Sequence, residues 1–217
     1  MNTLKTITII CFLGFTLNLN AWFIANETNI AFNVNTNVLT EQQSNPQSLD
    51  QTIAEAAGHF LKSTAYFQLF LEKVEIAQSA GIDNGELLNL AGNAIAQMEA
   101  ANEAYSRLIA VTGQLSYNTV ILDKLAGFDY TAYRKENRLN SPVFKLVETY
   151  LKSGDVRGCY AYINNQTLDI LARLKSVKDS LDNNPMPDIQ TCWRINQLYL
   201  ETTLFGQYTA EVFISLR

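Results

Sequence analysis

Residues 160–181, YAYINNQTLDILARLKSVKDSL, carry a seven-residue repeat. Apolar or small residues recur there at alternating spacings of three and four: Tyr160, Ile163, Thr167, Ile170, Leu174, Val177 and Leu181. This spacing places a single stripe along a helix, and a sustained repeat favours left-handed packing of that helix against others. The stretch therefore predicts a long amphipathic helix.

Three other stretches carry the same repeat. Their stripe positions are Ile53, Ala57, Phe60, Thr64, Phe67, Leu71 and Val74; Leu88, Ala91, Ile95, Met98, Asn102, Tyr105 and Ile109; and Ile195, Leu198, Thr202, Phe205, Thr209, Val212 and Leu216. Four such helices predict an all-α fold. We expect a left-handed antiparallel four-helix bundle built of two long helical hairpins joined by a shorter helical segment.

Capping and breaking residues set the expected helix boundaries. The first long helix begins near Asp50 and ends at Gly81, and the second runs from Asp83 to about Gly113. The connection between them is so short that the two helices must pack antiparallel. Asp155 caps the third long helix, Asn183-Asn184-Pro185 ends it, and the fourth opens at 187–188 and runs to the C-terminus.

The segment between the hairpins is less regular. We expect a short helix at 119–125, a polar loop at 129–138, and a second helix that starts at Ser141-Pro142 and ends at Gly154. Serine before proline is a typical helix start, because serine caps the helix and proline fits its first turn.

The N-terminus reads as an export signal spanning residues 1–21. Lys5 supplies a positive charge, residues 7–19 are mostly apolar, and Ala21 is a small residue at a plausible cleavage point. The alternative is an uncleaved anchor at 6–25, which is close to the length of a membrane-spanning helix. Both interpretations place the rest of the chain outside the cytoplasm, either periplasmic or secreted, and cleavage would leave no membrane span. An Asn-rich disordered linker, 22–49, then precedes the bundle domain, 50–217.

Cys159 and Cys192 remain after removal of such a signal, and an oxidising compartment favours a disulfide. The expected geometry opposes it. Cys159 lies 25 residues before Asn184, and Cys192 lies 8 residues after it. This mismatch corresponds to about 25 Å along the hairpin, whereas a disulfide needs Cα atoms within about 7 Å. The pair is therefore reduced, or it bridges two molecules, or the helix boundaries are wrong.

Polar residues interrupt the middle of all four stripes at similar distances from the hairpin turns. These residues are Thr64, Asn102, Thr167 and Thr202. If the hairpins pack side by side, the four could line a ligand pocket between the helices. The alternative is a hydrogen-bonded layer that fixes the helix register, and threonine can also bond to its own helix.

The segment 129–138 combines aromatic and cationic residues: Tyr130, Tyr133, Arg134 and Arg138. Such groups suit a polar or anionic ligand or a protein partner. An ordinary solvated loop is the alternative interpretation.

No residue set forms a recognisable catalytic or cofactor motif. His59 is the single histidine, whereas paired-metal bundles need a histidine on each of two helices, so we expect a structural histidine, at the surface or half-buried, and no metal. The net charge of -5 without a basic stripe gives no electrostatic case for nucleic-acid binding. We therefore expect an exported, non-enzymatic helical bundle without cofactors that mediates protein interaction or serves as an accessory structural component. The alternative is a periplasmic small-molecule-binding or sensing bundle, and a homo-oligomer is compatible with either.

Overall fold

The computed structural model describes residues 49–80, 84–112, 119–183 and 187–215. The expected signal peptide and almost all of the expected linker lie outside the described residues. The chain divides into two units, 1–54 and 55–217. The packing described below concerns the second unit.

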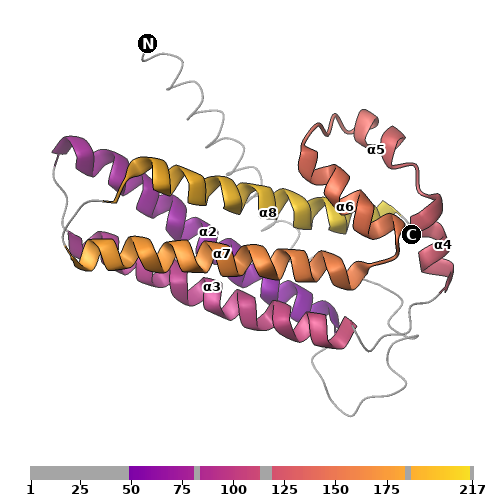
Figure 1. Cartoon of the computed structure of the whole chain (residues 1–217), viewed down its shortest axis with the longest axis horizontal. Helices are drawn as coiled ribbons and strands as arrows, with labels where there is room; N and C mark the ends of the chain where they lie inside the picture. Colours follow the sequence, from indigo (N-terminus) through magenta and orange to yellow (C-terminus); the bar gives the residue numbers. More distant parts are fainter. Residues whose placement is uncertain (1–48, 81–83, 113–118, 184–186, 216–217) are drawn as a thin grey trace. The chain divides into compact units, whose positions relative to one another are not determined.

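Seven helices and no strand make up the regular structure of the described residues (Figure 1). The helices are α2 (Leu49–Ala80), α3 (Asn84–Thr112), α4 (Thr119–Gly127), α5 (Tyr130–Glu136), α6 (Pro142–Lys152), α7 (Val156–Asp182) and α8 (Ile189–Ser215). The prediction of an all-α fold is confirmed, and the four long helices begin and end within a few residues of their expected bounds. Within the described segments, no helix combines the length and the apolarity of a membrane span.

Side-chain caps explain why α6 and α7 begin where the sequence indicates. The Ser141 hydroxyl accepts a hydrogen bond from the backbone N–H of Val143, and the Asp155 carboxylate accepts one from Gly158 N–H at 2.8 Å. Between the two helices, Gly154 has a φ of 72°. Glycine adopts this left-handed conformation without strain, so α6 can stop and α7 can begin within three residues.

The expectation of a polar loop at 129–138 is wrong, because most of this segment forms α5. Asp129 caps the helix by accepting hydrogen bonds from the backbone N–H groups of Thr131 and Ala132. Aspartate before a helix satisfies donors that have no partner within the helix. The cap signal was present in the sequence, but the high polarity of the segment favoured a loop.

Helix α3 has a buried face of small side chains and packs closely against α7. The buried face of α3 contains Ala91, Ala94, Ala101 and Ala104, and none of them projects beyond a methyl group. Among the helix pairs of the second unit, α3 and α7 have the most extensive close backbone packing. Helix α7 also packs against α8, and α6 packs against α4, α7 and α8.

The stripes predicted for the third and fourth long helices agree with the burial of α7 and α8 except at Tyr160 and Leu198, which are half-buried; next to Leu198, Tyr199 is buried instead. On α7 the buried positions include Ile163, Thr167, Ile170, Leu174, Val177 and Leu181, and on α8 they include Ile195, Thr202, Phe205, Thr209 and Val212.

The stripes of α2 and α3 are displaced by one residue at several points along each helix. Thr52, Ala56, Leu87, Ala94 and Leu108 are buried, whereas the predicted Ile53, Ala57, Leu88, Ile95 and Ile109 are half-buried. The same displacement occurs at mid-helix. Ser63 and Ala101 have no exposed surface there, whereas Thr64 and Asn102 are half-buried. One residue corresponds to about 100° of rotation, so the centre of each face changes.

Cys159 and Cys192 are free thiols, and neither has any exposed surface. The first alternative, a reduced pair, is therefore the one that the structure bears out. Burial raises the pKa of the Cys159 thiol to about 12, and the negative charge of Asp155 adds to this effect. Burial, followed by the charge of Asp188, raises the pKa of the Cys192 thiol to about 12 as well.

The burial of Leu174 predicts a large effect of its truncation. Leu174→Ala should lower the free energy of unfolding by about 2–5 kcal/mol, because the substitution leaves a cavity in the core. Leu174 is 1% exposed, whereas Leu168 on the same helix is 47% exposed and provides the matched control. Leu168→Ala should change stability by less than about 0.5 kcal/mol. Urea denaturation of both variants measures the difference, and equal losses would contradict the assigned face of α7.

The buried thiols predict slow alkylation in the folded state. In a Cys11→Ser chain at pH 8, iodoacetamide should leave Cys159 and Cys192 unmodified, since a thiol with a pKa near 12 is almost entirely protonated. In denaturant the pKa returns to about 8.5, and both should react. Mass spectrometry counts the adducts. Fewer than two adducts after unfolding without reductant would reveal a disulfide.

Candidate functional site

The predicted mid-helix polar layer forms only in part. The amide of Asn102 on α3 donates hydrogen bonds to Oδ1 of Asn164 at 2.8 Å and to Oγ1 of Thr167 at 3.4 Å, both on α7. Thr64 and Thr202 instead donate to carbonyl oxygens one turn earlier in their own helices, at 3.0 and 2.8 Å. The structure therefore joins Asn102 to Thr167, while the hydroxyls of the other two threonines bond within their own helices.

Sequence reasoning missed a buried polar contact that joins three long helices. The Ser63 hydroxyl on α2 donates to the carbonyl oxygen of Ala94 on α3 at 2.7 Å. Its single proton is then used, so the hydroxyl of Tyr199 on α8 donates to Ser63 Oγ at 2.6 Å. Burial raises the pKa of Tyr199 far above its ordinary value, which keeps the phenol protonated as a donor. This contact fixes the relative register of α2, α3 and α8.

Other polar contacts flank this one along α2. The Nδ1–H of His59 donates to Oε1 of Gln97 at 2.8 Å, and the amide of Gln68 donates to Oδ1 of Asn196. His59 is half-buried and hydrogen-bonded, as its expected structural role requires. Across the described ranges, no group of three or more His, Cys, Asp or Glu residues converges into a metal site.

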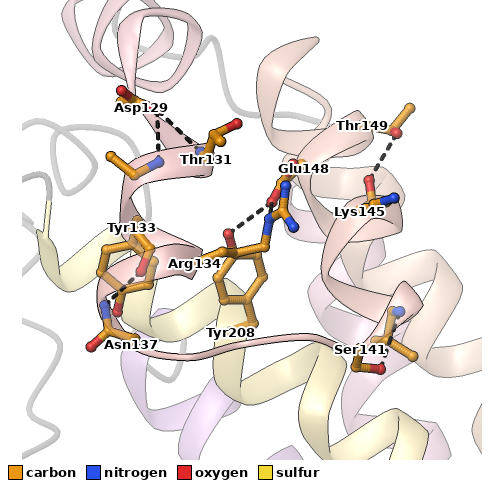
Figure 2. A network of polar contacts seen from close by, with 12 residues as sticks. Asp129, Thr131, Tyr133, Arg134, Asn137, Ser141, Lys145, Glu148, Thr149 and Tyr208 are labelled. Atoms are coloured by element: carbon orange, nitrogen blue, oxygen red, sulfur yellow. Dashed lines mark hydrogen bonds and ion pairs between the residues drawn. The ribbon is translucent and has the colours of Figure 1, made fainter.

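The densest polar cluster lies where α5 meets α6 and α8, and it is built around Glu148 (Figure 2). Glu148 is 5% exposed. Its Oε1 accepts a hydrogen bond from the guanidinium of Arg134 on α5 at 2.5 Å, and one from the hydroxyl of Tyr208 on α8 at 3.1 Å. Lys152 Nζ lies 3.7 Å from its other oxygen. Two cations and a phenol therefore compensate one buried carboxylate, which would otherwise be costly to bury.

Aromatic rings surround this carboxylate. Tyr208 packs against Phe144 and Tyr133, with ring centroids 4.8 and 6.0 Å apart, and Phe128 packs edge-on against Tyr130 at 4.9 Å. Burial and then the charge of Glu148 raise the pKa of Tyr130 to about 12, and the same causes raise that of Tyr208 further. Both phenols are therefore neutral donors at physiological pH.

Of the four residues proposed to contact a partner, the structure places two inside the cluster and two toward its edge. Tyr130 is buried, and its hydroxyl donates to the carbonyl oxygen of Leu125 at 2.9 Å. Arg134 is engaged with Glu148. Tyr133 is half-buried and reaches Glu211, while Arg138 is exposed just after the end of α5. Arg138 is therefore the exposed member of the set, and Tyr133 and Arg134 are each partly accessible.

Arg138 adopts an unusual backbone conformation. Its φ is 55°, and it is the one non-glycine residue with positive φ in the described part of the chain. The N–H of the next residue, Leu139, bonds to the carbonyl oxygen of Arg134 at 2.9 Å and closes the end of α5. Glycine is the usual residue at this position of a helix end, because a side chain there is strained.

One sequence signal could have identified Glu148. It lies four residues after Phe144, one after Val147 and three before Leu151, on the apolar face of the expected helix. A charged residue on an apolar face indicates a buried partner. The identity of that partner, Arg134, follows only from the packing of α5.

The contact between Ser63 and Tyr199 predicts strongly coupled substitutions. Ser63→Ala should lower the free energy of unfolding by about 1–3 kcal/mol, because it leaves the Tyr199 hydroxyl and the Ala94 carbonyl without this partner. Tyr199→Phe should lower the free energy of unfolding by less in the Ser63→Ala background than in the wild-type chain. A double-mutant cycle measured by urea denaturation gives the coupling. Additive effects of the two substitutions would contradict a direct hydrogen bond.

No family model matches the chain, and neither does any curated protein or any solved structure. The site is therefore interpreted from its own chemistry. Its features are a compensated buried carboxylate, a ring cluster that fixes α5, and an exposed arginine at the end of that helix.

Proposed function

We propose that the chain is an exported, non-enzymatic interaction protein whose four long helices form a left-handed antiparallel four-helix bundle. In this proposal the bundle is a scaffold, and the end of α5 is the surface that a protein partner contacts. Arg138 supplies the cation, and Tyr133 supplies the edge of an aromatic ring. Arginine and tyrosine are enriched among the residues that dominate protein interfaces.

The observation that carries this proposal is the backbone of Arg138. Residues with positive φ are mostly glycine, asparagine or aspartate, and arginine at a φ of 55° costs about 1–2 kcal/mol relative to the relaxed backbone. Strain of this kind is concentrated at functional positions, where it is tolerated for the sake of a particular side chain. An exposed arginine at a glycine position therefore favours a role for the guanidinium group.

The attachment of α5 supports the same proposal. In the structure, Arg134 and Tyr133 attach α5 to α6 and α8, so Arg138 projects from a supported element while these contacts are made. Interaction residues on a loop are most effective when a rigid scaffold positions them. The cluster around Glu148 provides this support. Its ion pair between Glu148 and Arg134 fits a supporting role.

Arg138→Gly separates stability from binding. We expect stability to be unchanged or higher by up to about 1 kcal/mol, because glycine relieves the strained φ but adds freedom to the unfolded chain. Partner binding should be lost, since the guanidinium group is removed. The measurement is native mass spectrometry of the chain purified from its own host, together with a thermal melt. Arg173→Gln, an exposed arginine on α7, is the control.

Three outcomes contradict the proposal. A partner retained in full by Arg138→Gly would exclude this edge as the contact. A small molecule or metal retained by the wild-type chain would favour the ligand-binding alternative, and its mass would identify the class. A Tm lowered by several degrees in Arg138→Gly would show that the arginine contributes to stability.

A further inference from the structure

Helix α5 depends on its surroundings to remain helical. It contains seven residues, and isolated helices of this length do not persist in water. Close backbone packing joins α6 to α4, α7 and α8. The attachment of α5 to α6 and α8 instead runs through side chains, chiefly Arg134 and Tyr133. Loss of these contacts would release the turn that carries them.

The first residue of α5 is held differently from the rest. The Tyr130 ring is buried, and Lys152 Nζ lies 5.0 Å from its centroid. Its hydroxyl bonds to Leu125 in the preceding helix, so this end stays attached when the other end moves. In contrast, the hydrogen bond from Tyr133 to Glu211 is long, at 3.4 Å. The C-terminal turn, residues 133–139, is therefore held chiefly by the Arg134–Glu148 pair and by the packing of the Tyr133 ring on Tyr208.

The carboxylate of Glu148 keeps partners if Arg134 leaves. Tyr208 donates to it from α8, and Lys152 lies within ion-pair distance on its own helix. Release of Arg134 therefore does not leave an uncompensated charge in the interior, which is the main cost of breaking a buried ion pair. The guanidinium group is already partly exposed and can exchange Glu148 for water.

We infer that residues 133–139 form a latch that detaches from α6 and α8 while the long helices remain folded. The Arg134–Glu148 pair closes the latch (Figure 2). Tyr130 stays in place as its fixed end. Opening uncovers the Tyr208 ring and the neighbouring Phe144 ring, which contact each other in the closed state. The latch carries Arg138, but its opening does not depend on the proposed partner.

Amide hydrogen exchange of the full wild-type chain tests this inference in low, sub-denaturing urea. The reporters are the backbone N–H groups of Asn137 and Leu139, which bond to Tyr133 and Arg134 in the closed turn. We expect their exchange rates to be independent of urea, as in local opening, whereas protected amides of α3 and α7 should respond to urea through global unfolding. If the amides of Asn137 and Leu139 in the wild-type chain exchange only through global unfolding, the latch is overturned.

Arg134→Gln tests the role of the ion pair. We expect it to speed exchange at Asn137 and Leu139 by about 10- to 100-fold, the equivalent of a hydrogen bond to a charged group, and to leave α3 and α7 unchanged. Arg173→Gln is matched in charge and removes an exposed pair with Asp169, so it should leave the reporters unchanged. Equal acceleration of the reporters and of α7 by Arg134→Gln would overturn the latch. A partner retained by Arg138→Gly, together with the expected exchange pattern, would contradict the proposed function and leave the latch unaffected.

Discussion

The close approach of α3 and α7 is the constraint on which the rest of the fold depends. The two helices have the most extensive close packing among the helix pairs of the second unit, and α3 buries a face that contains four alanines. Their connections then determine the neighbours, because α2 precedes α3 and α8 follows α7 after short turns. Larger side chains at Ala94 or Ala101 would separate the helices and break the match between facing stripes.

Polar groups in the interior select one arrangement of these helices. The Ser63 hydroxyl links α2 to both α3 and α8, and the Asn102 amide links α3 to α7. Apolar faces tolerate sliding and rotation, whereas a buried hydroxyl loses its partner if a helix shifts by one residue. The hydrogen bonds therefore specify the register, and apolar burial supplies most of the stabilisation.

The segment between α3 and α7 forms a polar cluster against the long helix α8. Helices α4, α5 and α6 are short, and α6 packs against α8 (Figure 1). This packing places Glu148 beside Tyr208 (Figure 2). A buried carboxylate then becomes the attachment for α5. This arrangement brings residues from three separate parts of the chain into one cluster and leaves Arg138 exposed at its edge, where the proposed interaction takes place.

The sequence by itself determined the helices, because their signals are local. Seven-residue spacing predicted α7 and α8 together with most of their buried faces. Ser141 indicated where α6 begins, Gly154 where it ends, and Asp155 where α7 begins. The same local signals gave bounds for α2 and α3. They also placed Cys159 and Cys192 at different distances from the turn between α7 and α8, which agrees with free thiols.

Only the tertiary structure decided which side chains meet. On α3, alanines lie on either side of the apolar stripe, so the sequence left the rotation of the helix ambiguous by one residue. Only packing against a neighbouring helix decided that Ala101, and not Asn102, lies at the centre of the buried face. The pairs Ser63–Tyr199 and Arg134–Glu148 join residues 136 and 14 positions apart, which no local pattern records. Hydrogen bonds between separate helices depend on packing distance and rotation, and these are set by all the contacting faces together.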